Sequence, residues 1–305
     1  MVRAIATAAL AVLVTATAAS AAALTSPASV TALAADGGRV AFAAARSAKD
    51  CDRVRIWTPA TGKVVRLGRT TSCVNTSTGT GIASLAIAGN RVLWLHYTGG
   101  NIREWSLFTA TPTRPVPRRL AFAAADVDLP APIVVGDGDA SRLGDILPYA
   151  VGRTVVALRV NGARRFAWAA PARVVALSAR GGEFAVAQAG GRVAVLDAAG
   201  RVSRDERYAD EISAVEITGT GVLVQRGRAL ELRGAGAPRT WTLPAGARLE
   251  DADGDRAFYV VRGQARMLTL STSRDVRIGA ASRVAAGGTT VALASGRTVR
   301  TLRAG

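Results

Sequence analysis

A unit of four short apolar runs recurs along this chain and limits the folds open to it. Residues 53–67 show its form: Val54 and Ile56 alternate with charged residues, Trp57 ends the run, and a second run follows the turn at residues 58–62. Alternation is the period of a half-buried strand, and Pro, Thr and Gly between two such runs predict a β-hairpin. No stretch shows a sustained 3.6-residue apolar period. We therefore expect an all-β fold.

Seven units can be followed, and the last has only three runs. They span residues 30–67, 84–122, 133–169, 174–208, 212–243, 248–278 and 282–302. The strands predicted within them include residues 118–122, 146–151 and 256–261. The first inward residue of each second run recurs at intervals that shorten from about 54 to about 34 residues, the latter close to the length of a four-stranded propeller blade. These residues are Val40, Val92, Ile146, Phe184, Val222, Ala257 and Val291. The sequence predicts a single β-propeller of four-stranded antiparallel blades, seven in number, with six as the alternative.

The seventh unit needs a fourth strand from elsewhere, because an open sheet edge invites unwanted pairing. We expect residues 24–29 to pair with residues 297–302 and close the ring. Pro27 limits that pairing, since proline has no N–H to donate to the ladder.

Two tryptophan-containing runs carry a family resemblance. Residues 54–57 (Val-Arg-Ile-Trp), followed by Thr61, Gly62 and Lys63, resemble the third strand and turn of a WD40-type blade, and residues 102–105 are a weaker echo. The Asp that normally follows the Trp is replaced by Thr58 and Ser106, and no Gly-His pair opens a repeat. The chain is thus similar to the broad class of secreted propeller repeats (WD40-like, TolB-like or quinoprotein-like). This resemblance implies a propeller fold and indicates almost nothing about activity.

The N-terminus is typical of an exported protein. Residues 1–21 have a positive Arg3 followed by an uncharged run, which predicts a signal peptide cleaved after Ala21 or Ala23. We assign residues 28–305 to the propeller domain and expect a secreted or cell-surface protein with no membrane span after cleavage. A retained N-terminal anchor is the alternative.

The two cysteines of an exported protein can form a disulfide. Cys51 and Cys73 flank the third and fourth runs of the first unit, so adjacent antiparallel strands bring them to the same end of the blade. In an oxidising compartment we expect them to form a disulfide. Two unpaired thiols are the alternative.

Two acidic stretches are candidate ion sites. Asp137, Asp139 and Asp145 lie in an apparent insertion of the third unit, where carboxylates can bind a ligand or cation; the alternative is a solvated loop. Residues 251–255 carry three more aspartates, but they align with the first turn of a blade, and we interpret them as turn residues. The lone His96 excludes any mechanism that needs two histidines, and we expect it to be structural.

The formal net charge of +17 is the one feature that points to a class of partner. Arg114, Arg118 and Arg119 form the densest local group and are the candidate anion-binding residues for a polyanionic polymer. The alternative, which we favour, is a compositional bias. In that case arginines are scattered and many pair with acids such as Asp205, Glu206, Asp210 and Glu211.

These observations favour an exported, monomeric, non-catalytic binding module whose partner is an unknown protein or a polyanionic polymer. No nucleic-acid motif, catalytic motif, metal-ligand spacing or cofactor-binding motif occurs in the sequence. We therefore assign no cofactor and no catalytic residues. The alternative function is an extracytoplasmic propeller hydrolase or lyase that acts on a glycan or similar polymer through carboxylates at the axial funnel.

Overall fold

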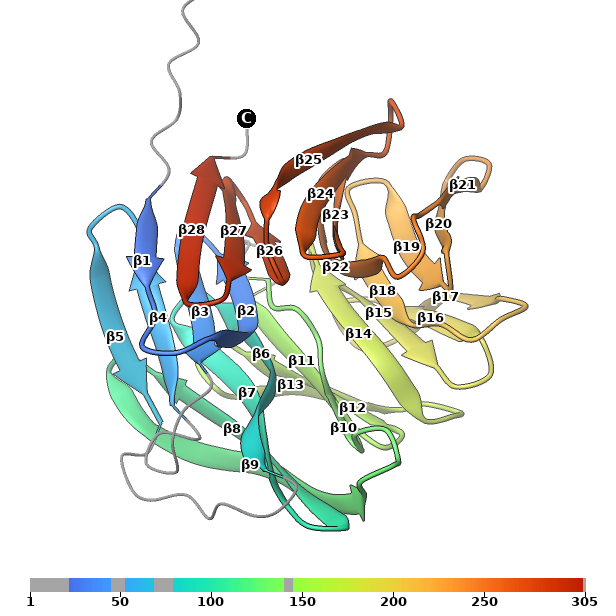
Figure 1. Ribbon diagram of the computed structural model, residues 1–305. Coiled ribbons are helices and arrows are strands. Elements are labelled where there is room, and N and C mark those ends of the chain that lie inside the picture. The colour runs from blue at the N-terminus through green and yellow to red at the C-terminus, as the bar shows by residue number, and fades with distance from the viewer. Residues whose placement is uncertain (1–21, 45–52, 69–78, 140–144, 304–305) are drawn as a thin grey trace, which may run out of the picture.

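The computed structural model describes residues 22–44, 53–68, 79–139 and 145–303, which form strands and no helix. The strands make seven four-stranded antiparallel sheets. In Figure 1 these sheets are the separate blades of a β-propeller. The predicted all-β fold with seven blades is confirmed. No helix in the described residues is long and apolar enough to cross a membrane.

Six blades follow chain order from the innermost strand outward. Blade 1 comprises β2 (Val30–Asp36), β3 (Arg39–Ala44), β4 (Val54–Thr58) and β5 (Lys63–Leu67). Blade 2 comprises β6 (Thr80–Ala88), β7 (Arg91–Gly99), β8 (Ile102–Thr111) and β9 (Arg114–Asp126). Blade 3 comprises β10 (Ile133–Val135), β11 (Ile146–Val151), β12 (Thr154–Arg159) and β13 (Arg164–Ala169).

The second half of the chain repeats the pattern. Blade 4 comprises β14 (Val174–Arg180), β15 (Glu183–Gln188), β16 (Arg192–Leu196) and β17 (Val202–Arg207). Blade 5 comprises β18 (Ala214–Ile217), β19 (Gly221–Arg226), β20 (Ala229–Gly234) and β21 (Arg239–Thr242). Blade 6 comprises β22 (Arg248–Asp253), β23 (Arg256–Val261), β24 (Gln264–Thr269) and β25 (Arg274–Ala280).

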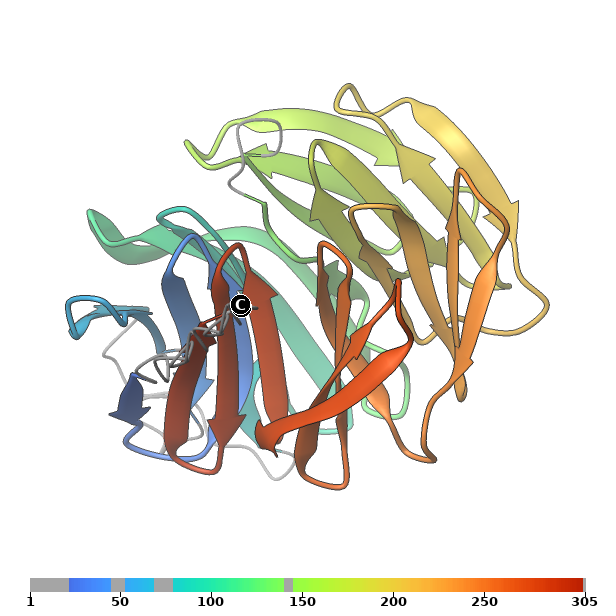
Figure 2. The same cartoon turned by 90° about the horizontal axis from the view of Figure 1, so that it is seen from above.

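Blade 7 joins the two ends of the described chain. It comprises β26 (Arg283–Gly287), β27 (Thr290–Ser295), β28 (Thr298–Arg303) and, on the outer side, β1 (Ala23–Thr25). Ala23 pairs with Arg300, Leu24 with Val299 and Thr25 with Thr298. Figure 2 shows this blade among the others from above. The predicted closure is confirmed, and the strand ends at Thr25, so Pro27 lies outside the ladder.

The inner strands β2, β6, β10, β14, β18, β22 and β26 form the wall of the axis. Each contacts the next, and β26 contacts β2, so the wall is continuous. Seven clusters of buried apolar side chains lie between neighbouring blades, one at each junction. Small residues such as Ala and Val supply much of each cluster, because the inner ends of adjacent blades approach closely.

The long outer strand β9 differs from the sequence prediction, which began this strand at residue 118. It begins at Arg114 and runs through Pro115 and Pro117. This is physically allowed because β9 pairs only with β8 and its other edge is unpaired within the sheet. A proline there removes no ladder hydrogen bond when its missing N–H would face outward.

Several predictions concern residues outside those described. The signal peptide at residues 1–21 and the Cys51–Cys73 disulfide are among them, and both stay predictions.

Candidate functional site

A cavity of about 290 Å³ opens on the propeller axis. Residues from the inner strands of all seven blades line it, mostly from the first half of each strand. Its wall combines alanine, valine and leucine side chains with polar ones. The polar residues include Thr31, Ser84, Ser213, Glu250 and Arg283.

Three carboxylates from three blades meet at the axis. Asp137 follows β10, Glu216 lies on β18 and Asp251 lies on β22; one oxygen of each lies within 4.8 Å of the others. Asp137 and Glu216 face the cavity, whereas Asp251 is not among its lining residues. We call these three residues the axial carboxylate group.

Asp137 reaches the axis because its neighbours are glycines. A Cβ on Gly136 would lie 2.6 Å from the Leu177 Cβ, and one on Gly138 would lie 2.5 Å from the Ile87 carbonyl oxygen. The backbone therefore threads between β14 and β6 where only glycine fits. The segment also stays paired with β11: Gly136 N–H donates to Pro148 O at 3.1 Å, and Asp139 and Ile146 exchange backbone hydrogen bonds. Residues 136–139 extend the inner strand of blade 3 and do not form a solvated loop.

Glu216 and Asp251 are both fixed by the adjacent blade. The Ser178 hydroxyl donates to Glu216 Oε2 at 2.8 Å and accepts the Ile217 N–H at 3.1 Å. Asp251 Oδ1 accepts the Ala252 N–H at 2.7 Å, and Oδ2 accepts the Ala286 N–H at 2.6 Å. These contacts join blade 4 to blade 5 and blade 6 to blade 7.

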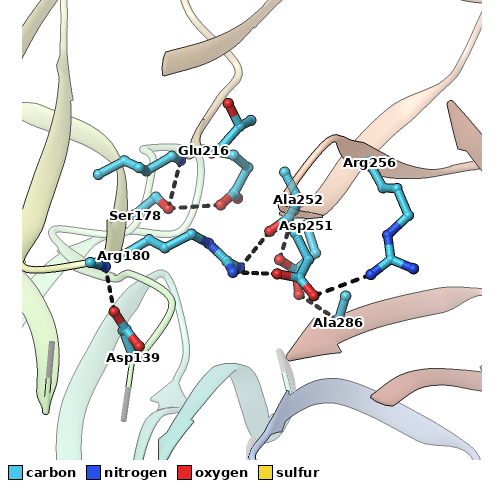
Figure 3. A network of polar contacts seen from close by, with 12 residues as sticks. Asp139, Ser178, Arg180, Glu216, Asp251, Ala252, Arg256 and Ala286 are labelled. Carbon is cyan, nitrogen blue, oxygen red and sulfur yellow. Dashed lines mark hydrogen bonds and ion pairs between the residues drawn. The ribbon is translucent and has the colours of Figure 1, made fainter. Parts of the chain in front are cut away.

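Arg180 supplies positive charge near the axial carboxylate group. Its guanidinium extends from blade 4 to blade 6, donating to Asp253 Oδ1 at 2.5 Å and to the Ala252 carbonyl at 2.6 Å (Figure 3). The next N–H, that of Gly181, donates to Asp139 Oδ2 at 2.5 Å. Arg180 lies at the end of β14, so it sits at the opposite end of the axis wall from most of the cavity.

The carboxyl groups hold their protons tightly. Burial, together with the charges of Asp137 and Asp251, raises the pKa of Glu216 well above its usual range. Burial and the charge of Asp137 do the same to the pKa of Asp251, and burial raises the pKa of Asp137. Burial works against the charge of Arg180, but nearby carboxylates such as Asp251 and Asp253 outweigh it and raise the pKa of Arg180.

This arrangement permits three kinds of chemistry. Protonated carboxyls can donate hydrogen bonds to a ligand in the cavity, and a carboxyl with a raised pKa beside an ionised one can act as a general acid. Three carboxylate oxygens are also ligands that a hard cation such as Ca²⁺ prefers. The charge of Arg180 and the hydrogen bonds from Ser178, Ala252 and Ala286 already compensate part of the negative charge and occupy some of the oxygens, which leaves less of both for a metal ion.

The predicted ion-site residues are separated by the fold. Asp137 joins the axial carboxylate group, Asp139 binds the Gly181 backbone, and Asp145 is exposed at the start of β11. Residues 254–255 form the turn between β22 and β23 as predicted, but Asp251 belongs to the axial group. His96 lies 3.0 Å from the Thr80 hydroxyl, which links β6 to β7.

Sequence reasoning missed Glu216 and Arg180, and it wrongly interpreted Asp251 as a turn residue. They come from separate blades, and no local motif contains them. One signal was present: Glu216 interrupts Val215 and Ile217, both of which are buried. An acid at the inward position of an innermost strand is expensive to bury without a partner.

Comparison with known proteins identifies the architecture. No family model matches the chain, and no curated protein matches it in sequence. The structure is similar to that of Raptor from Chaetomium thermophilum, with a TM-score of 0.58 and 13% identity over 93% of this chain. It is also similar to a chain of the mitotic checkpoint complex, with a TM-score of 0.61, 14% identity, and coverage of 98% of this chain and 99% of that one.

These likenesses show the fold alone. The chain spans 28% of the length of the Raptor chain. The computationally designed Ika8 protein is a further similar structure, with a TM-score of 0.50 and 13% identity over 92% of this chain. The WD40-like propeller architecture implied by residues 54–63 is therefore supported, whereas activity has to be argued from the site.

Proposed function

We propose that this chain is an exported, non-catalytic binding protein that holds a small ligand in the axial cavity. The observation that carries the proposal is the position of Asp137 and Glu216, which face a cavity lined by all seven blades. Ligand sites are typically concave, with apolar walls and a few polar groups that fix orientation. The composition of residues 1–21, which is typical of a signal peptide, supports export.

The chemistry of the cavity favours a ligand rich in hydroxyl or amino groups. Carboxyl groups, threonine and serine hydroxyls and Arg283 offer both donors and acceptors, and no aromatic side chain is among the described residues that line the cavity. A volume of about 290 Å³ suits a ligand the size of a monosaccharide. The hydrogen bonds that already engage Glu216 favour a binding role over turnover.

Substitution of Ala214 tests this proposal, because Ala214 lines the cavity on β18 next to Glu216. We expect Ala214→Leu to fill the cavity and abolish binding of monosaccharides or polyamines detected by ligand-observed NMR. Val202→Leu on the exposed outer strand β17 is the control and should bind as the wild type does. Equal binding by both variants, or no binding by the wild type across a panel of sugars, sugar acids and polyamines, would rule out the axial site.

A second function has one observation in its favour. Glu216 has a raised pKa, faces the cavity and lies beside Asp137, as a general acid in a glycan hydrolase or lyase does. If the protein is such an enzyme, product release from a glycan panel should be measurable, and Glu216→Gln should remove it while ligand binding persists. Binding without any turnover in the wild type supports the non-catalytic function.

A further inference from the structure

A second cavity, of about 370 Å³, lies between blade 2 and blade 3. Three arginines line it: Arg91 at the start of β7, and Arg114 and Arg118 on β9. The turn between β12 and β13 supplies Asn161, Gly162 and Ala163. None of the residues described as lining this cavity lines the axial one, so the two are separate sites.

Arg91 is held in place by both blades. Its Nε donates to the Val160 carbonyl of blade 3 at 2.6 Å, and its Nη1 donates to the Thr109 hydroxyl of blade 2 at 3.2 Å. Its Nη2 lies against Gly162, where a Cβ would come within 2.9 Å of it and where φ is +90°. The guanidinium is therefore fixed before any ligand arrives, which lowers the entropic cost of binding.

The three arginines gather without a compensating acid. No carboxylate is among the described residues that line the cavity, and neither Arg114 nor Arg118 makes an ion pair in the described part of the chain. Burial and the charges of Arg118 and Arg114 lower the pKa of Arg91. Elsewhere in the molecule arginines meet acids, as in the Arg226–Glu231 pair at 2.6 Å. The repulsion among Arg91, Arg114 and Arg118 is the kind that a bound anion would relieve.

We propose that this cavity binds a tetrahedral oxyanion, a phosphate or sulfate group. Guanidinium groups match such oxyanions with paired N–H donors, and three positive charges suit a divalent anion better than a single carboxylate. Asn161 adds a neutral donor, because its Oδ1 accepts the Ala163 N–H at 2.9 Å and its NH₂ end is left to donate. The cavity is larger than one phosphate, so it also has room for the sugar or other unit that carries the group.

Neighbouring arginines on β9 provide a matched test. Arg118 lines the cavity, whereas Arg119 does not and stacks over the Phe122 ring at 5.4 Å. By isothermal titration calorimetry at low salt, we expect saturable binding of inorganic phosphate and sulfate and far weaker binding of acetate. Arg118→Gln should weaken phosphate binding roughly tenfold, the effect of one charge-assisted hydrogen bond, and Arg119→Gln should leave it unchanged. Equal effects of the two variants would mean diffuse charge and would overturn the proposal.

Asn161→Asp gives a second, independent readout. The change keeps the side-chain oxygen that caps Ala163 but places a carboxylate beside the three arginines. We expect it to raise the melting temperature without ligand and to weaken phosphate and sulfate binding. No change in either quantity would contradict the site. Glucose 6-phosphate tests whether the natural ligand is a free ion or a larger molecule that carries the oxyanion. Tighter binding than inorganic phosphate indicates a larger molecule, and equal binding indicates the free ion.

Discussion

At the scale of single residues, burial raises the pKa of each carboxyl in the axial carboxylate group. Glu216 is 7% exposed and Asp251 5% exposed, and the Arg180 guanidinium nearby donates to Asp253 and to the Ala252 carbonyl. A carboxyl whose pKa is higher in the folded than in the unfolded chain binds its proton more tightly when folded. Its contribution to stability is therefore fully present below the ordinary carboxyl pKa and is lost as the pH rises towards the folded-state pKa.

Glu216→Gln should remove part of this pH dependence. Between about pH 5 and pH 8 we expect the melting temperature of the wild type to fall, whereas that of Glu216→Gln falls less and is about 2–4 °C higher at the upper pH. Glutamine can still accept the Ser178 hydroxyl. Glu211→Gln, at an exposed position, is the control with the same charge change. Parallel profiles for wild type and Glu216→Gln, measured by scanning calorimetry, would show that folding does not raise the pKa of Glu216.

At the scale of elements, short apolar runs predicted almost every strand, because strands such as β3 and β15 bury nearly every side chain between the flanking blades. It predicted β23 (Arg256–Val261) and β11 (Ile146–Val151) with their observed bounds. It shortened β9, because prolines are normally read as strand breakers and sequence does not reveal which strand is at an edge. The axial group could not be predicted, since Asp137, Glu216 and Asp251 meet only after three blades close into a ring.

The glycines around Asp137 should be sensitive to a single methyl group. We expect Gly138→Ala to cost about 1–3 kcal/mol in urea unfolding, because the new Cβ would meet the Ile87 backbone and the Leu147 side chain. Gly236→Ala is the control, since nothing lies within 4 Å of a Cβ there and φ is not positive. If the two variants unfold at the same urea concentration, the segment is looser than its contacts indicate.

At the scale of the whole molecule, charge follows two rules. In blades 4 and 5, arginines pair with acids: Arg192 with Asp205, Arg226 with Asp210 at 2.8 Å, and Arg233 with Glu206 at 3.5 Å. This is the pairing expected of a compositional excess of arginine. Between blades 2 and 3 the arginines converge instead. The net charge of +17 therefore combines arginines that are scattered over the molecule with one local group of arginines. The spacing of arginines along the sequence did not distinguish the two.

Ring closure is the prediction that belongs to this scale. A chain that begins at Val30 lacks β1 and the partly buried Leu24, which packs on the cluster between blades 7 and 1. We expect it to lose at least about 2 kcal/mol relative to a chain that begins at Ala22, and to associate through the free edge of β28. Unfolding titrations and size-exclusion chromatography measure both effects. A shortened chain that is equally stable and monomeric would show that β1 does not stabilise the ring.

Because β1 and β28 meet in one blade, the chain can be circularly permuted. Ala22 accepts the Thr301 N–H at 2.9 Å, so the two ends of the described chain are neighbours. A short linker can join them, and new ends can be opened in the exposed turn at residues 235–238, between β20 and β21. The permuted chain would keep all seven blades and both cavities. Blade 7 would then be completed by a hairpin that joins β28 to β1, and blade 5 would be closed by pairing of β21 at the new N-terminus with β20 at the new C-terminus.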